Sequence, residues 1–328
     1  MSRPNILIVS TLSSPFILED VDLLRKHAEV EHLVVHGIRA PLAIAGAVRR
    51  SDAVLTWFVS VYAAAAVRAA RKSGKRSVLV AAGADVADVP FAGYGPGRNV
   101  WKRRVVGWAL RHASAVLAVD DSLVAKAARL GNYDGANIHT VPTGYDPDRW
   151  FPAGKKESLV LTVAGCETEI RLKVKGVDFL LQVARTLPDV RFVLVGLHQP
   201  VFARFEATRP PNVELIPYLS RDGLLPLYQR AKVYCQPSLS EGLPNSLCEA
   251  MLCGCSPVGT TAGGIPAAIG ETGPVVPYGN VALMQQAIEA ALLASPQTAE
   301  SARARIIRRY PLAAREASLL MYLGIPHT

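Results

Sequence analysis

Short apolar runs alternate with longer amphipathic stretches along the first half of the chain. The runs are rich in β-branched residues and bounded by polar residues or glycine, which is typical of buried parallel strands. The stretches between them carry apolar residues at helical spacing and basic residues in their last turns, where a helix dipole favours positive charge. Such alternation predicts right-handed βαβ units on one parallel sheet. The expected strands are 5–10, 30–36, 52–58, 77–82 and 115–120, and the expected helices are 18–27, 41–50, 61–72 and 100–112.

Residues 141–158 interrupt this alternation with three prolines and two glycines, which is typical of a linker. The apolar runs then resume and predict a second parallel sheet. We therefore expect an α/β protein of two Rossmann-like domains, at residues 1–145 and 146–310, with a helix in 311–328 that packs back on the first domain. Ligands of such sheets bind at the carboxyl ends of the strands, which predicts a cleft between the domains. The strands expected in the second domain are 158–164, 191–196, 212–218, 232–238 and 255–260.

The composition is that of a well-buried globular protein, because 50% of the residues are hydrophobic and 19% are charged. The longest apolar window without a charge, 53–67, is shorter than the roughly 20 residues that span a bilayer. The N-terminus begins directly as a strand and shows no signal-peptide pattern. Five cysteines without a paired framework are typical of a reducing compartment. We expect a cytoplasmic protein whose cysteines are small core residues and ligate no metal.

The net charge of the chain is +9, and the first half carries more of this positive charge than the second. One predicted helix there combines basic residues with Trp101 and Trp108, and it suits peripheral contact with the inner face of an anionic membrane. A solvated basic face over two core tryptophans is the alternative. Nucleic acid is disfavoured, since no helix-turn-helix, zinc or aromatic-sheet motif accompanies the charge. The basic residues are Arg98, Lys102, Arg103, Arg104 and Arg111.

Two glutamates in the segment 240–270 carry the most informative chemistry. Glu241 and Glu249 stand eight positions apart, and Pro244 suits the first turn of a helix of about ten residues. Glu241 should therefore lie in the loop before this helix and Glu249 a little over one turn inside it, both facing one edge. Free N–H groups at the helix start offer donors to sugar hydroxyls or phosphate oxygens. Solvated surface is the alternative, which the apolar neighbours and the glycine pair 263–264 disfavour.

Residues 234–270 resemble the signature of the large retaining glycosyltransferase family 4, whose GT-B fold has two Rossmann-like domains facing each other across a cleft. The resemblance is close over the C-terminal domain and weaker over the whole chain. It implies that Glu241 contacts the donor sugar and that Glu249 binds the nucleotide ribose. It also implies contacts from the donor sugar and phosphate to backbone amides around Gly242, Leu243 and Asn245.

The resemblance further implies two cations for the leaving diphosphate, one after the first strand of the second domain and one before its next helix. Lys175, followed by glycine, matches the second position. The first position departs from the family pattern, because Cys166 stands where relatives carry arginine. Arg171 and Lys173 are the substitutes, on a slightly longer loop. Fixed cations stabilise the charge that develops on a leaving diphosphate.

Candidates in the first domain match the family less well. Relatives carry a glycine pair in the first loop, where this chain has Ser13 and Ser14 ahead of Pro15. These serines are expected either to cap the next helix or to contact phosphate or acceptor. Relatives also place a histidine near the end of the fourth strand. Asp85 is the nearest polar residue there, and it is expected either to orient an acceptor hydroxyl as a catalytic residue or to stabilise a turn.

These features predict a glycosyltransferase that moves a hexose-type sugar from a UDP- or GDP-sugar to an acceptor hydroxyl. The resemblance implies retention of configuration without a metal or other cofactor. The basic helix favours a lipid-linked or surface glycan as the acceptor. Two alternatives stay open: another GT-B enzyme, such as a nucleotide-sugar epimerase or a phosphorylase, and a non-catalytic nucleotide- or sugar-binding module. A nicotinamide dehydrogenase is disfavoured, because no GxGxxG follows the first strand.

Overall fold

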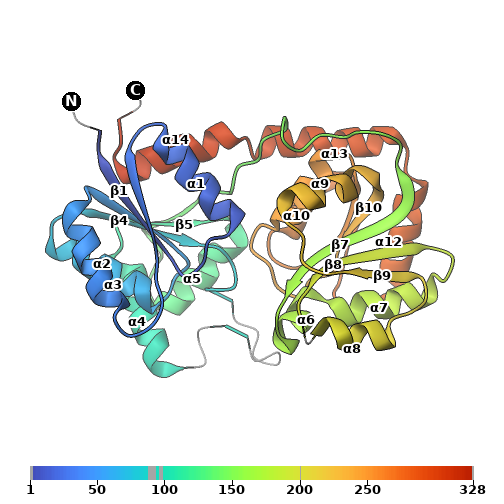
Figure 1. Ribbon diagram of the computed structural model, residues 1–328, viewed down its shortest axis with the longest axis horizontal. Helices are drawn as coiled ribbons and strands as arrows, with labels where there is room; N and C mark the ends of the chain where they lie inside the picture. The colour runs from blue at the N-terminus through green and yellow to red at the C-terminus, as the bar shows by residue number, and fades with distance from the viewer. Residues whose placement is uncertain (1–2, 88–93, 96–98, 200, 327–328) are drawn as a thin grey trace. The chain divides into compact units, whose positions relative to one another are not determined.

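The chain forms two compact units, shown in the computed structural model of Figure 1. Unit 1 comprises residues 1–144 and 312–328, and unit 2 comprises residues 145–311. Unit 1 is therefore built from both ends of the chain. The structure describes residues 3–87, 94–95, 99–199 and 201–326.

Unit 1 contains a parallel sheet of six strands in the order β2-β1-β3-β4-β5-β6. Helices α1 and α14 lie on one face of this sheet and α2, α3 and α4 on the other (Figure 1). All five strands expected from the sequence are present, whereas β6 is too short to show an apolar pattern. The strands are β1 Asn5–Ser10, β2 Glu29–Val34, β3 Ala53–Trp57, β4 Arg76–Ala81, β5 Ala115–Ala118 and β6 Ile138–Thr140; the helices are α1 Pro15–Arg25, α2 Ala40–Arg50, α3 Val61–Lys72, α4 Val100–His112, α5 Val124–Gly131 and α14 Leu312–Leu323.

Unit 2 contains a second parallel sheet of six strands, in the order β12-β11-β10-β7-β8-β9. Apolar residues of α7, α8 and α12 pack on one face of it and form the core of the unit. Helices α10 and α13 pack against each other and against β11. The strands are β7 Glu157–Cys166, β8 Arg191–Leu197, β9 Val213–Ile216, β10 Ala231–Gln236, β11 Ser256–Thr260 and β12 Val275–Val276; the helices are α6 Glu169–Lys175, α7 Val177–Thr186, α8 Val201–Thr208, α9 Arg221–Arg230, α10 Asn245–Leu252, α11 Ile265–Ile269, α12 Val281–Leu293 and α13 Pro296–Arg309.

A buried ion pair fastens α14 to unit 1. The Arg315 guanidinium donates from Nε and Nη2 to the two carboxylate oxygens of Asp20, at 3.0 and 2.6 Å, and both side chains are buried. Trp57 donates its indole N–H to the same carboxylate at 3.0 Å, and Arg315 donates from Nη1 to the Val141 carbonyl. The carboxylate and guanidinium are thus held in a hydrogen-bonded network, which is what allows a charged pair to be buried.

Several sequence predictions concern single features of these units. All five cysteines are buried and none forms a disulfide, as expected for core residues. Among the helices of the described residues, none has both the length and the apolar character that crossing a bilayer requires. The basic helix predicted at 100–112 is α4. Arg98 lies outside the described residues.

Candidate functional site

The carboxyl ends of β11, β10 and β7, three neighbouring strands of unit 2, carry the predicted site residues. Glu241 lies in the loop that follows β10, Lys175 ends the helix that follows β7, and Gly263 lies in the turn that follows β11. Because carboxyl ends of parallel strands meet at one edge of the sheet, the topology alone brings these segments together. The expected clustering of the second-domain candidates at this edge is therefore what the fold produces.

Two glycines allow the segments to approach closely. Gly176 ends α6 with φ +70°, and a Cβ there would lie 2.0 Å from the carbonyl oxygen of Pro237. Gly263 has φ +54°, and a Cβ there would lie 2.0 Å from the carbonyl oxygen of Glu241. Any other residue at either position would push the backbone of the β10–α10 loop away. The Leu239 amide also donates to the Val174 carbonyl at 2.8 Å, so this loop is clamped from both sides.

The Glu241 carboxylate is the centre of the site. Its Oε1 accepts from Lys175 Nζ at 2.7 Å, from the Ser238 hydroxyl at 2.7 Å and from Gln236 Nε2 at 3.1 Å. Its Oε2 has no hydrogen-bond partner among the residues that the structure describes. The glutamate is therefore oriented through one oxygen and keeps the other for a hydroxyl donor. Lys175 has three N–H donors, of which this ion pair uses one.

Helix α10 begins four residues after Glu241 in the chain. The helix spans Asn245–Leu252, shorter than the predicted ten residues, and Pro244 is its N-cap instead of its first helical residue. The amides of its first turn are not used by intrahelical hydrogen bonds, and their partial positive charge suits a phosphate or sugar oxygen. Leu243 is buried, and the Asn245 side chain accepts from the Tyr145 hydroxyl at 2.7 Å.

Glu249 occupies a more enclosed environment than the sequence suggests. It is buried in α10, where Arg221 donates from Nε and Nη2 to Oε1 at 3.1 and 3.0 Å and the Tyr228 hydroxyl donates to Oε2 at 3.2 Å. Burial raises the pKa of the Glu249 carboxyl, and the Arg221 guanidinium opposes that rise. Both carboxylate oxygens thus already have partners within the protein.

A network of aromatic and polar contacts connects the two glutamates. Tyr228, the partner of Glu249, lies against Tyr234 with the two ring centres 6.0 Å apart. Tyr234 donates to Oε1 of Gln236 at 3.2 Å, and Gln236 donates to Glu241. Sequence reasoning missed Arg221 and Tyr228, which lie outside the 234–270 signature, and it gave no role to Tyr234 and Gln236 within that signature.

Arg171 and Lys173 were expected to lie in a loop, but they lie in helix α6. The prediction of a loop was therefore wrong. Thr168 caps its start by accepting from the Arg171 amide at 3.3 Å, and Gly176 ends it. Arg171 lies one turn before Lys175 on the same side of the helix, whereas Lys173 projects elsewhere and is exposed. The helix therefore brings Arg171, and not Lys173, toward Lys175. Arg171 also donates from Nε to the Gly165 carbonyl at 3.1 Å.

Cys166, which ends β7, does not replace the missing arginine. Burial raises the pKa of its thiol to about 11, so the side chain is uncharged at neutral pH. The positive charge at this edge of the sheet is supplied from α6.

The candidates in unit 1 take mainly structural positions. Ser14 is the N-cap of α1, but its hydroxyl accepts no helix amide, and Ser13 is exposed. The Asp85 carboxylate accepts from the amides of Val59, Ala82 and Gly83 at 2.8, 3.0 and 2.8 Å. Burial raises the pKa of Asp85, and these amide hydrogen bonds oppose the rise. Of the two roles expected for Asp85, this geometry is that of turn stabilisation.

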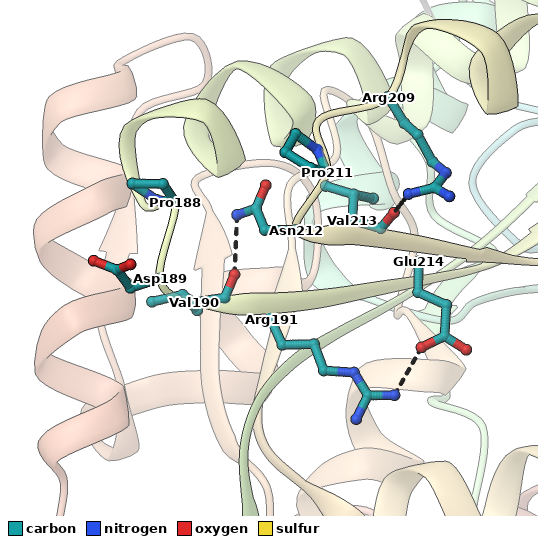
Figure 2. A pocket seen from close by; sticks show the side chains of 9 residues that line it. All are labelled: Pro188, Asp189, Val190, Arg191, Arg209, Pro211, Asn212, Val213 and Glu214. Atoms are coloured by element: carbon teal, nitrogen blue, oxygen red, sulfur yellow. Dashed lines mark hydrogen bonds and ion pairs between the residues drawn. The ribbon is translucent and has the colours of Figure 1, made fainter.

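Unit 2 also contains a cavity of about 370 Å³ that is not part of this site (Figure 2). It lies at the amino ends of β8 and β9, the opposite edge of the sheet from Glu241. Both arginines of its lining have partners: Arg191 donates to Glu214 at 2.7 Å, and Arg209 donates to the Val213 carbonyl (Figure 2). Elsewhere in the described part of the chain, no cluster of three His, Cys, Asp or Glu side chains could hold a metal ion.

Comparison with known sequences gives a family match in the same unit. Residues 158–294 match the family model described as glycosyl transferases group 1. A D-inositol 3-phosphate glycosyltransferase of Mycobacterium sp. (strain KMS) is 32% identical over 222 residues, which cover 62% of this chain and 49% of the relative. The Mycobacterium avium (strain 104) protein of the same name is 28% identical over 227 residues, 64% of this chain and 52% of the relative. The chain spans about half the length of these curated relatives.

Solved structures resemble the whole chain. Anabaena HepE in complex with UDP has a TM-score of 0.76 at 16% identity and covers 98% of this chain and 99% of its own. Sucrose-phosphate synthase from Thermosynechococcus elongatus has a TM-score of 0.78 at 14% identity, with coverages of 97% and 98%. At such low identity these likenesses concern the fold.

Proposed function

We propose that this chain is a group 1 glycosyltransferase with the GT-B fold, and that it transfers a hexose-type sugar from a UDP- or GDP-sugar to an acceptor hydroxyl. The observation that carries the proposal is the Lys175–Glu241 pair, held beside the amides of α10 at the carboxyl edge of the sheet. Such a site offers an oriented acceptor for a sugar hydroxyl, together with fixed positive charge for a phosphate.

The proposed reaction needs these two properties at neighbouring points. As the bond between the anomeric carbon and the diphosphate oxygen breaks, negative charge accumulates on the diphosphate. Lys175, Arg171 and the first-turn amides of α10 would stabilise that charge without a metal. Glu241, oriented through Oε1, would accept a donor-sugar hydroxyl through Oε2. We propose that the acceptor oxygen bonds to the anomeric carbon from the face that the diphosphate leaves, and that its proton passes to a diphosphate oxygen.

Nucleotide recognition is assigned to the Glu249 end of the polar network. A carboxylate has about four lone-pair positions, of which Arg221 uses two on Oε1 and Tyr228 uses one on Oε2. We propose that a ribose hydroxyl binds the remaining position on Oε2, as the family resemblance implies. Anabaena HepE, which shares this fold, is described in complex with UDP and with UDP-glucose, and this supports a nucleotide-sugar as the ligand.

The two competing functions use the same site differently. An epimerase or phosphorylase would act on the donor alone, or on phosphate and a glycan, without an added acceptor. A binding module would hold the nucleotide-sugar unchanged. The Lys175–Glu241 pair favours chemistry over passive binding, because a cation aimed at the leaving group stabilises charge that develops only during bond cleavage.

A panel of UDP-, GDP- and ADP-sugars tests the proposal and names the donor. We expect slow nucleotide release from one of them, with a donor KM about 10- to 100-fold higher in Glu249→Gln, because one charge-assisted hydrogen bond to ribose is weakened. Glu271→Gln is the matched control, since this carboxylate of unit 2 is exposed and pairs with Arg305. Nucleotide binding without release from any donor, even with sugar acceptors added, would favour the binding module.

Retention is tested on the product. With an acceptor that turns over, the anomeric proton of the new linkage should show the same configuration as the donor in its NMR coupling constant. An inverted linkage would contradict the same-face reaction proposed above. Activity that survives a chelator is expected on the same grounds, and activity restored only by a divalent metal would contradict the role given to Lys175 and Arg171.

The acceptor is proposed to be a lipid-linked or surface glycan. Two relatives are named for a small phosphorylated molecule, D-inositol 3-phosphate. The surface of unit 1 favours the lipid-linked class, and the physical reason is developed in the next subsection.

A further inference from the structure

Three adjacent helices of unit 1 form a layer without acidic residues. Helices α2, α3 and α4 pack side by side on one face of the sheet (Figure 1). None of them contains an aspartate or glutamate, whereas α1 on the other face carries Glu19 and Asp22 and α14 carries Glu316. The layer carries nine lysines and arginines: Arg49, Arg50, Arg68, Arg71, Lys72, Lys102, Arg103, Arg104 and Arg111.

An apolar groove runs across this layer at the starts of its helices. It has a volume of about 1010 Å³, and its lining includes Pro41 of α2, Tyr62 of α3, and Trp101 and Trp108 of α4. Arg68 and Arg104 also line it. Helices of βαβ units start where strands end, so the groove lies toward the carboxyl edge of the sheet.

Large apolar side chains stand out from the protein around the groove. Ile38 is 95% exposed, Leu42 78% and Trp101 62%, and all three lie at or near the start of a helix of this layer. A single exposed apolar residue needs no explanation, but a contiguous group beside a groove marks an interaction site.

The basic residues of α4 oppose the stability of their own helix. Lys102, Arg103 and Arg104 lie in or next to its first turn, where the helix dipole disfavours positive charge and where the helix has no acidic residue. Within the part of the chain that the structure describes, none of the three forms an ion pair. An external anion would remove this repulsion.

We propose that this surface, formed by α2, α3 and α4, docks on an anionic phospholipid bilayer. The basic side chains would contact lipid phosphates, while Trp101, Ile38 and Leu42 enter the interfacial region. Basic charge alone would suit any polyanion. The exposed apolar group beside the groove can be buried in a bilayer and not against a phosphate backbone, and it therefore favours the bilayer over a nucleic acid. Docking would bring the carboxyl edge of the unit 1 sheet close to lipid-linked molecules. It does not depend on the donor chemistry.

Sedimentation with lipid vesicles tests the proposal on the full chain. We expect binding to vesicles of equimolar phosphatidylglycerol and phosphatidylcholine, and little binding to phosphatidylcholine alone. Lys102→Gln with Arg103→Gln should lower the partition coefficient about 25-fold, from roughly fivefold per basic residue near an anionic surface. The matched control is Lys155→Gln with Arg308→Gln, two exposed basic residues of unit 2, and its partition should be unchanged.

The variant Trp101→Gln distinguishes docking on a membrane from purely ionic binding to a polyanion. We expect it to lower vesicle binding severalfold at high as well as low salt, because it removes apolar and not ionic contact. Equal vesicle binding by the α4 double variant and the control would overturn the proposal. The proposal would also be overturned if the protein bound duplex DNA as tightly as vesicles and Trp101→Gln left both affinities unchanged. Circular dichroism verifies that each variant is folded, and none of these outcomes bears on donor turnover.

Discussion

Replacing Lys175 by methionine is expected to lower the kcat of sugar transfer by about 10²- to 10³-fold, the loss seen when one fixed donor to a developing anion is removed. The methionine keeps the length and apolar stem of the side chain, so α6 and its packing should persist. In the resting protein the Lys175 ammonium is held 2.7 Å from Glu241 Oε1. In the proposed reaction its charge acts on the diphosphate as the bond breaks, so a large share of its effect should appear in kcat.

Lys173→Met is the control for this change. Lys173 lies two residues earlier in α6, is exposed, and has no ion-pair partner among the described residues. Its replacement removes the same charge from the same helix at a position turned away from Glu241. We expect kcat to change less than about threefold, as for an exposed solvated charge. Equal losses for Lys173→Met and Lys175→Met would show that α6 acts only through its total charge, and the assigned geometry would then fail.

The expected effect on kcat of replacing Arg171 lies between the effects of the two lysine variants. It shares the face of α6 with Lys175, but one of its N–H groups already donates to the Gly165 carbonyl. The sequence offered both Arg171 and Lys173 as substitutes for the missing family arginine, and the helical geometry separates them. The sequence could not provide that geometry, since Ile170, Leu172 and Val174 alternate with polar residues as a strand would. The Thr168 cap and the left-handed Gly176 decide the matter in favour of a helix.

Some residues of the candidate site could also be recognised from the sequence, and others could not. Glu241 and Lys175 belong to segments that sequence reasoning could recognise separately, although they lie 66 residues apart. Their contact follows from the strand order, in which β10 and β7 are neighbours. Arg221 and Tyr228 could not be recognised, because they come from α9, a helix with an internal proline and no family motif among the residues quoted above. A buried carboxylate such as Glu249 requires charged or hydrogen-bonding partners. The sequence could predict that such partners exist, but not which residues they are.

The helices and strands could be predicted from the sequence better than the long-range ion pair that holds α14 on unit 1. Fully buried strands such as β3 form continuous apolar runs that stand out in the sequence. The return of α14 to unit 1 depends on Arg315 and Asp20, which are 295 residues apart and look like surface residues of amphipathic helices. Nothing local distinguishes Arg315 from the exposed arginines of α13, because only the tertiary structure places Asp20 opposite it.

Arg315→Met is expected to destabilise unit 1 by about 3–5 kcal/mol, because it leaves the Asp20 carboxylate buried without its cation. Urea unfolding followed by hydrogen–deuterium exchange measures this separately for peptides of the two units, with unit 2 expected to change little. Lys26→Met is the matched control: it removes an exposed ion pair with Glu316, at 3.2 Å, and should cost less than about 1 kcal/mol.

The double variant Asp20→Asn with Arg315→Met tests whether the uncompensated charge is the cause. The asparagine carbonyl can still accept from the Trp57 indole, which donates to Asp20 at 3.0 Å in the native chain. If the buried carboxylate is what destabilises Arg315→Met, the double variant should recover most of the loss, a coupling of the size expected for residues in one network. If the double variant is no more stable than Arg315→Met, the cost lies instead in the lost packing of the arginine stem against Trp57, whose ring centre is 5.5 Å from the guanidinium.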